Sequence, residues 1–163
     1  MIIITNTEND FEFESIKFEF NEMELSALKL MAHFRLDHKV EEKNSEYYKS
    51  KIRAHYFGLA GEYAVAKAVN GFFDPMPKPE GDNHTGDVLA DLDGSIRISV
   101  KTTGEQPPLF KVKTLLELEK VTHIALCHFY EPMIKIIWLK NKNYLLDNHF
   151  ERSFSYGDRF CCY

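Results

Sequence analysis

Two side chains able to do chemistry, the carboxylate of Asp87 and the amine of Lys101, lie in one segment that alternates apolar and polar residues. A three-residue loop from Leu92 to Gly94, with the glycine in the left-handed conformation, would pair Asp87 with Ser99. Directly opposed residues have Cβ atoms about 5 Å apart and diagonal neighbours about 7 Å, so Lys101 can reach the surroundings of Asp87. The two residues form either a solvated cross-strand ion pair or part of a site whose carboxylate binds a cation.

The same pairing sorts the predicted hairpin into an apolar and a polar face. One face carries Val88, Ala90, Ile96, Ile98 and Val100, and the other carries Asp87, Asp91, Arg97, Ser99 and Lys101. A two-residue loop would instead mismatch polar and apolar residues across the strands. We therefore predict strands over about 87–91 and 95–103, with the polar side chains together on one face.

A third candidate, Glu62, lies in a predicted helix over about 45–70 that stops at Asn70. Gly58 and Gly61 precede it, and glycine costs up to about 1 kcal/mol inside a helix, so two of them need a reason such as close packing against a strand. No basic residue stands three or four positions from Glu62 to form a surface ion pair. Taken singly, Glu62 fits a solvated surface acid as well as a site residue.

The N-terminal part of the chain predicts further elements. Residues 11–20 alternate apolar and polar types with a change of parity near Ser15, which predicts an added hairpin with a bulge or turn at that point. Asn21 followed by Glu24 resembles a capping arrangement, and the apolar spacing after it predicts a helix over about 22–40.

The remaining elements complete a mixed α/β order. Residues 73–86 have the prolines, glycines and short polar residues of a loop. A short amphipathic helix is predicted over 112–120, followed by two strands between 122 and 139 joined by a tight turn. From Lys140 onward, the apolar residues show no clear helical or alternating spacing. This order predicts the α/β class, with helices covering a small central mixed sheet.

Size and composition predict one soluble domain over residues 1–163. The chain is 44% hydrophobic and has no apolar run near the roughly 20 residues that span a bilayer and no basic leader, so we expect a cytoplasmic protein without membrane contact. The net charge is -5, and the first fifty residues hold 11 acids and 6 bases, which leaves 14 of each in the remainder. Three cysteines without CxxC spacing do not indicate a zinc site.

Jointly, Glu62, Asp87 and Lys101 resemble the PD-(D/E)XK superfamily of nucleases, in which a helix with a Glu precedes a strand with an Asp and then a strand with an acid, any residue and a Lys. The helix segment GLAGEYAVAKAVNG looks like the first helix of the Holliday-junction-resolvase-like branch, and RISVKTT looks like the third-strand motif. The resemblance covers about residues 45–140, and implies a restriction-endonuclease-like core between an N-terminal extension (1–44) and a C-terminal tail (141–163).

The resemblance has one departure, because Ser99 stands where the family has an acid two residues before the lysine. It implies a Mg²⁺ or Mn²⁺ site held by Asp87, the backbone carbonyl of Val100 and Glu62, with Glu62 replacing the missing acid. Lys101 would orient the attacking water or stabilise developing negative charge.

The implied activity is that of a metal-dependent endodeoxyribonuclease acting on duplex or branched DNA. Substrate contacts are expected from Ser99, Arg97, Asn83 and His84, since a histidine side chain in general can assist proton transfer near neutral pH. Many enzymes of the resolvase-like branch are dimers, so a homodimer is an open alternative. Two other functions also stay open: a nuclease fold without catalysis that binds nucleic acid or protein, and an unrelated structural α+β domain.

Overall fold

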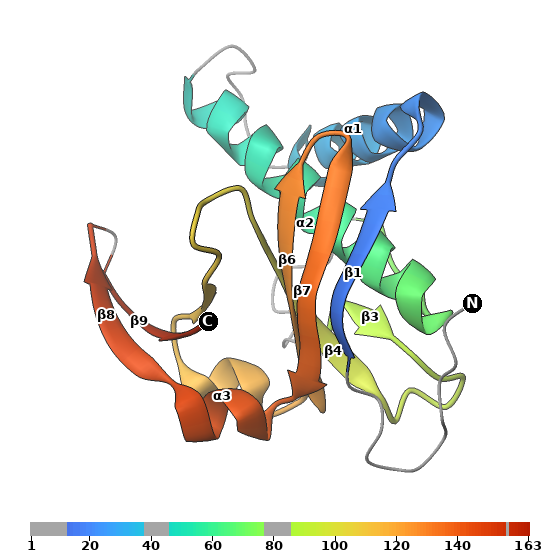
Figure 1. Ribbon diagram of the computed structural model, residues 1–163. Helices are drawn as coiled ribbons and strands as arrows, with labels where there is room; N and C mark the ends of the chain where they lie inside the picture. The colour runs from blue at the N-terminus through green and yellow to red at the C-terminus, as the bar shows by residue number, and fades with distance from the viewer. Residues whose placement is uncertain (1–12, 38–45, 77–85, 156) are drawn as a thin grey trace.

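The computed structural model describes residues 13–37, 46–76, 86–155 and 157–163, and these form an α/β fold around a mixed sheet (Figure 1). The large sheet has six strands in the order β1-β7-β6-β4-β3-β2, and a smaller sheet has the order β5-β9-β8. The elements are β1 Phe13–Glu19, α1 Glu22–Asp37, α2 Glu46–Val69, β2 Phe72–Phe73, β3 Val88–Leu89, β4 Arg97–Thr103, β5 Phe110–Val112, the 3₁₀ helix η1 Leu115–Leu118, β6 His123–Tyr130, β7 Met133–Asn141, α3 Asn143–Asn148, β8 Phe150–Phe154 and β9 Gly157–Cys162.

Neighbouring strands of the large sheet, as the structure describes it, alternate in direction except at one pair. β4 and β6 run parallel, whereas the other neighbouring pairs are antiparallel. Parallel neighbours need a crossover connection, and the chain between β4 and β6 supplies it with β5 and η1. The α/β class with a mixed sheet flanked by helices, predicted from the order of elements, is confirmed.

Two apolar cores lie on the two faces of the large sheet. α2 covers one face and α1 packs on α2, and Figure 1 shows α2 running behind the sheet. Their core includes Leu28, Leu59, Val65, Ile98 and Phe129. The other face carries β5, η1, α3 and β9, with a second core that includes Phe110, Leu118, Leu126, Trp138 and Leu145.

The start of α1 and the end of α2 lie where the sequence predicts them. At the start of α1, the Asn21 side chain accepts the Glu24 N–H at 2.9 Å while the Glu24 carboxylate accepts the Asn21 N–H at 3.0 Å, a reciprocal capping box. α2 ends at Val69, and Asn70 directly after it has the left-handed φ of 52°. No helix in the described ranges is long and apolar enough to cross a bilayer.

Three expectations need correction. Residues 13–19 form one strand that pairs with β7, not a hairpin, and the left-handed Ser15 (φ 62°) lies within that strand, where it shifts the parity. The helix predicted over 112–120 is only the short η1, because the chain before it pairs with β9. The predicted tail instead forms α3, β8 and β9; the middle of β8 is exposed on both sides, which explains why no alternation marks it.

Candidate functional site

The hairpin that carries Asp87 has the predicted register. Val88 pairs with Ile98, and the Ala90 N–H donates to the carbonyl of Ile96 at 3.0 Å. Gly94 has a left-handed φ of 71°, as a three-residue loop requires. The prediction of a buried apolar face is confirmed by Val88, Ile98 and their neighbours in the core under α2.

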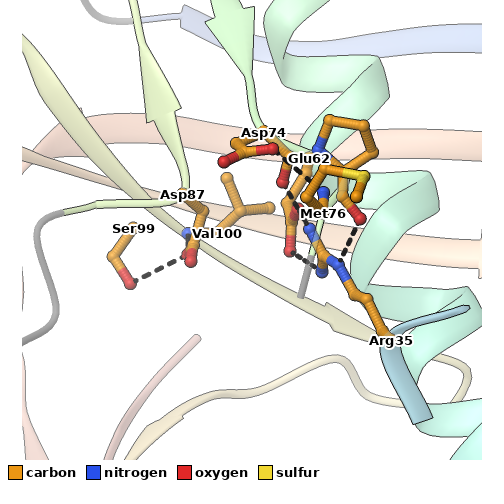
Figure 2. Close-up of polar contacts among 8 residues, drawn as sticks. Arg35, Glu62, Asp74, Met76, Asp87, Ser99 and Val100 are labelled. Atoms are coloured by element: carbon orange, nitrogen blue, oxygen red, sulfur yellow. Dashed lines mark hydrogen bonds and ion pairs between the residues drawn. The ribbon is translucent and has the colours of Figure 1, made fainter. Parts of the chain in front are cut away.

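Asp87 is anchored to β4 by its backbone and its side chain. Its N–H donates to the Ile98 carbonyl at 2.8 Å. Its carboxylate oxygen Oδ2 accepts the Val100 N–H at 2.7 Å and lies 3.4 Å from the Ser99 hydroxyl, as Figure 2 shows. Both side-chain contacts use Oδ2, and within the described ranges the second oxygen, Oδ1, has no hydrogen-bond partner. Ser99, which replaces the expected acid, is thus a neighbour of Asp87.

Lys101 projects from the opposite face of β4 to the one that α2 covers. It pairs in register with Leu126 of β6, whose side chain belongs to the second core. Its Nζ lies 3.9 Å from Oε2 of Glu117, and its side chain is 39% exposed. The other Glu117 oxygen accepts the N–H groups of Lys113 and Thr114 at 2.9 and 3.3 Å, which fixes this carboxylate at the start of η1.

Glu62 is buried and paired with an arginine from α1. The Arg35 guanidinium donates to Oε1 and Oε2 of Glu62 at 3.1 and 2.8 Å, a bidentate ion pair. The same guanidinium donates to the carbonyls of Asp74 and Pro75, so it ties α1, α2 and the chain after β2 together (Figure 2). The sequence left open whether Glu62 is a solvated surface acid or a site residue. Its burial excludes the solvated surface acid.

The three predicted catalytic residues therefore lie in three local environments. Within the described ranges, no hydrogen bond or ion pair joins Asp87 to Lys101 or either of them to Glu62. Arg97 keeps its place on the polar face, where its Nε donates to the Gly94 carbonyl at 2.9 Å. Asn83 and His84 lie outside the described residues.

The donor groups do not complete a magnesium site in this arrangement. The described part of the chain contains no group of three or more His, Cys, Asp or Glu side chains that could hold a metal ion. Mg²⁺ prefers several oxygen ligands, including one or two carboxylates. Asp87 has an oxygen to offer beside Val100, but the Glu62 carboxylate is already held by Arg35.

The cysteine thiols do not provide an alternative site. Cys127, Cys161 and Cys162 are all buried. Burial raises the pKa of the Cys127 thiol and raises that of Cys162 to about 12, so both are protonated at neutral pH. The thiolate is the reactive form, so these buried, protonated thiols are poor nucleophiles.

Sequence reasoning missed two partners of the candidate residues. Arg35 lies 27 positions from Glu62, and Glu117 lies in the crossover after Lys101; neither stands at a spacing that signals contact. Comparisons with protein-family models, with curated proteins and with solved structures found no match to this chain. Any function must therefore be argued from the geometry of these residues.

Proposed function

We propose that this chain is a metal-dependent nuclease that hydrolyses phosphodiester bonds in DNA, duplex or branched, with Asp87 and Lys101 at its centre. The observation that carries the proposal is the hairpin: β3 and β4 hold the Asp87 carboxylate against Ser99 and Val100, with Lys101 two residues further along the same face. The order of elements supports it, because α2 is followed by β2, β3 and β4 in antiparallel pairs and then by the parallel β6.

Lys101 has the properties of a group that binds and stabilises a phosphate. Its ammonium is part-exposed, and its 3.9 Å separation from Glu117 Oε2 is longer than a hydrogen bond. An exchangeable ion pair of this kind contributes under about 1 kcal/mol, so a phosphate can compete for the lysine. Positive charge fixed near the reacting phosphate would stabilise the negative charge that develops in hydrolysis. Arg97 and Ser99, on the same face, are the proposed substrate contacts.

Dependence on Mg²⁺ or Mn²⁺ is part of the proposal and needs a second acid beside Asp87 and the Val100 carbonyl. Glu62 can serve only if it leaves Arg35. Glu117 is a second candidate for that acid, since its carboxylate already lies beside Lys101. Substitution of each glutamate by glutamine, with Mn²⁺ affinity as the readout, tells which of the two is used.

A second function is favoured by one specific observation. Arg35 neutralises the Glu62 carboxylate with two hydrogen bonds, which suits a fold that has given up metal binding and acts as a nucleic-acid or protein binding module. In that case Asp87 and Ser99 only stabilise the hairpin. The two functions differ in one measurable property, which is cleavage.

The experiment is incubation of supercoiled plasmid and of a branched DNA junction with the purified chain and Mg²⁺ or Mn²⁺. The nuclease proposal predicts nicking by the wild type, loss of nicking in Lys101→Ala, and normal nicking in the control Lys49→Ala. Lys49 is a suitable control because it pairs with Glu46 on the exposed surface of α2. Metal-independent DNA binding without cleavage would instead support the binding module.

A further inference from the structure

Helix α1 has a second apolar stripe on its outer side. Its inner side, which packs against α2, is buried through Leu28, Ala32 and Leu36. Roughly opposite that side on the helical wheel, three large apolar side chains are 54–82% exposed, and a small exposed residue, Ala27, lies between them: the stripe is Met23, Ala27, Leu30 and Phe34. A surface helix of a monomer usually carries polar residues there, so this stripe needs a partner.

The spacing of the stripe is symmetric about its centre. Its four positions are separated by four, three and four residues. If a second α1 packs against it in the antiparallel direction, Met23 lies opposite Phe34 of the copy and Ala27 lies opposite Leu30 of the copy. Each large side chain of the inner pair then meets a small one, which is how two helices interdigitate. Antiparallel helices also bring opposite ends of their dipoles together.

The surface continues from α1 onto the chain around β2. Phe72 and Met76 are 65% and 62% exposed, and Arg35 ties this segment to α1 through the carbonyls of Asp74 and Pro75. Met23, Ala27 and Phe72 line one open groove of about 680 Å³ between α1, α2 and β2. The groove therefore joins the Met23 end of the stripe to Phe72 of this segment.

The exposed area is close to what a stable association needs. The five large side chains together expose roughly 500 to 800 Å², taking about 150 to 250 Å² for each complete side chain. Standard protein interfaces bury about 800 Å² on each partner, whereas the largest apolar patch of a monomer is about 300–600 Å². The surface thus reaches the upper end of the range of a monomer and approaches the area that one partner buries in a standard dimer.

We propose that two copies of this chain associate through α1, packed antiparallel about a two-fold axis that passes between Ala27 and Leu30. A two-fold interface requires a surface complementary to itself, and the symmetric spacing of the stripe provides that property. The proposal does not depend on the nuclease activity, because Lys101 projects from the sheet face that α1 does not cover.

The first test measures the molar mass of the full chain by light scattering and sedimentation, over roughly 1 to 200 µM because interfaces of this size reach micromolar affinity or better. We expect a wild-type dimer, a Leu30→Glu monomer and a Leu92→Glu dimer. Leu92 is a matched control since it is a fully exposed leucine at the tip of the β3–β4 hairpin, outside the stripe. A wild type that stays monomeric, or a Leu30→Glu chain that dimerises like wild type, overturns the proposal.

The second test fixes the direction of the helices by disulfide formation under mild oxidation. The native cysteines are buried and do not interfere. A mixture of Met23→Cys and Phe34→Cys chains should couple to each other faster than either couples to itself, because antiparallel packing places these two positions opposite. Faster self-coupling of Met23→Cys indicates parallel packing and overturns the two-fold arrangement.

Discussion

The guanidinium of Arg35 holds both carboxylate oxygens of Glu62, at 3.1 and 2.8 Å, across the interface of α1 and α2. Both side chains are largely buried. Removing one member of a buried ion pair leaves the other charge without a partner, whereas replacing both with apolar residues removes the desolvation cost as well. The pair therefore links the packing of α1 on α2 to the ability of the Glu62 carboxylate to bind a metal ion.

Arg35→Ala should lower the free energy of unfolding by about 3–5 kcal/mol, because Glu62 would stay buried without its cation. The double variant Arg35→Met with Glu62→Met should recover much of that loss. Lys49→Ala, which breaks an exposed pair with Glu46, should cost under about 1 kcal/mol. Urea unfolding measures all three. An Arg35→Ala loss no larger than the Lys49→Ala loss would mean that the buried pair contributes no more to stability than an exposed one.

The two glycines of α2 should respond differently to alanine. A Cβ at Gly61 would collide with the Thr102 hydroxyl and lie 3.2 Å from Val100 Cγ1, and the β-branched threonine cannot turn away freely. Gly61→Ala should therefore lower stability by about 1–3 kcal/mol. A Cβ at Gly58 would lie 3.8 Å from Glu62 Oε1, an ordinary contact, so Gly58→Ala should gain up to about 1 kcal/mol of helix propensity. Equal effects in thermal unfolding would contradict this close contact of α2 with β4.

Stability should fall in acid through Glu24. The hydrogen bond from the Lys67 ammonium, at 2.9 Å, contributes most to holding the pKa of Glu24 below its ordinary value of 4.5, with the Asn21 N–H and Tyr63 hydroxyl adding to it. A carboxyl with a lowered folded-state pKa stabilises the fold above its unfolded-state pKa, and this stabilisation is lost as pH falls through the folded-state pKa.

Urea unfolding at about pH 6 and about pH 3 checks the role of Glu24. Glu24→Gln should lose less stability between the two pH values than the wild type, because the variant has no carboxylate to protonate. Glu22→Gln, an exposed glutamate in the same first turn, serves as the control and should follow the wild type. Identical losses for wild type and Glu24→Gln would rule out a role for this carboxylate in acid unfolding.

The parts of the fold that sequence predicts are those set by local pattern. The register of the β3–β4 hairpin follows from alternation and from Gly94, and the ends of α1 and α2 follow from Asn21, Glu24 and Asn70. Each of these signals acts within a few residues of the chain. They also place Asp87, Ser99 and Lys101 on one face.

The parts that sequence does not predict depend on distant contacts. The pairing of β1 with β7 joins residues more than 100 positions apart, and β8 and β9 gain order from β5 rather than from an alternating pattern of their own. Likewise, the separate partners of Glu62 and Lys101 come from α1 and from η1. Local spacing specifies which residues share a strand face, but it does not specify which charges meet across elements.

The central claim is that Asp87 and Lys101 act together on a phosphodiester, and a double-mutant cycle of DNA cleavage rates with Mn²⁺ tests it most directly. Asp87→Asn keeps an oxygen that can accept the Val100 N–H, so the hairpin stays intact. Each of Asp87→Asn and Lys101→Ala should lower the rate by about 10²-fold or more, and the double variant should be no slower than the slower single one. Four proteins with equal rates, or a wild type that does not cleave, would contradict the claim.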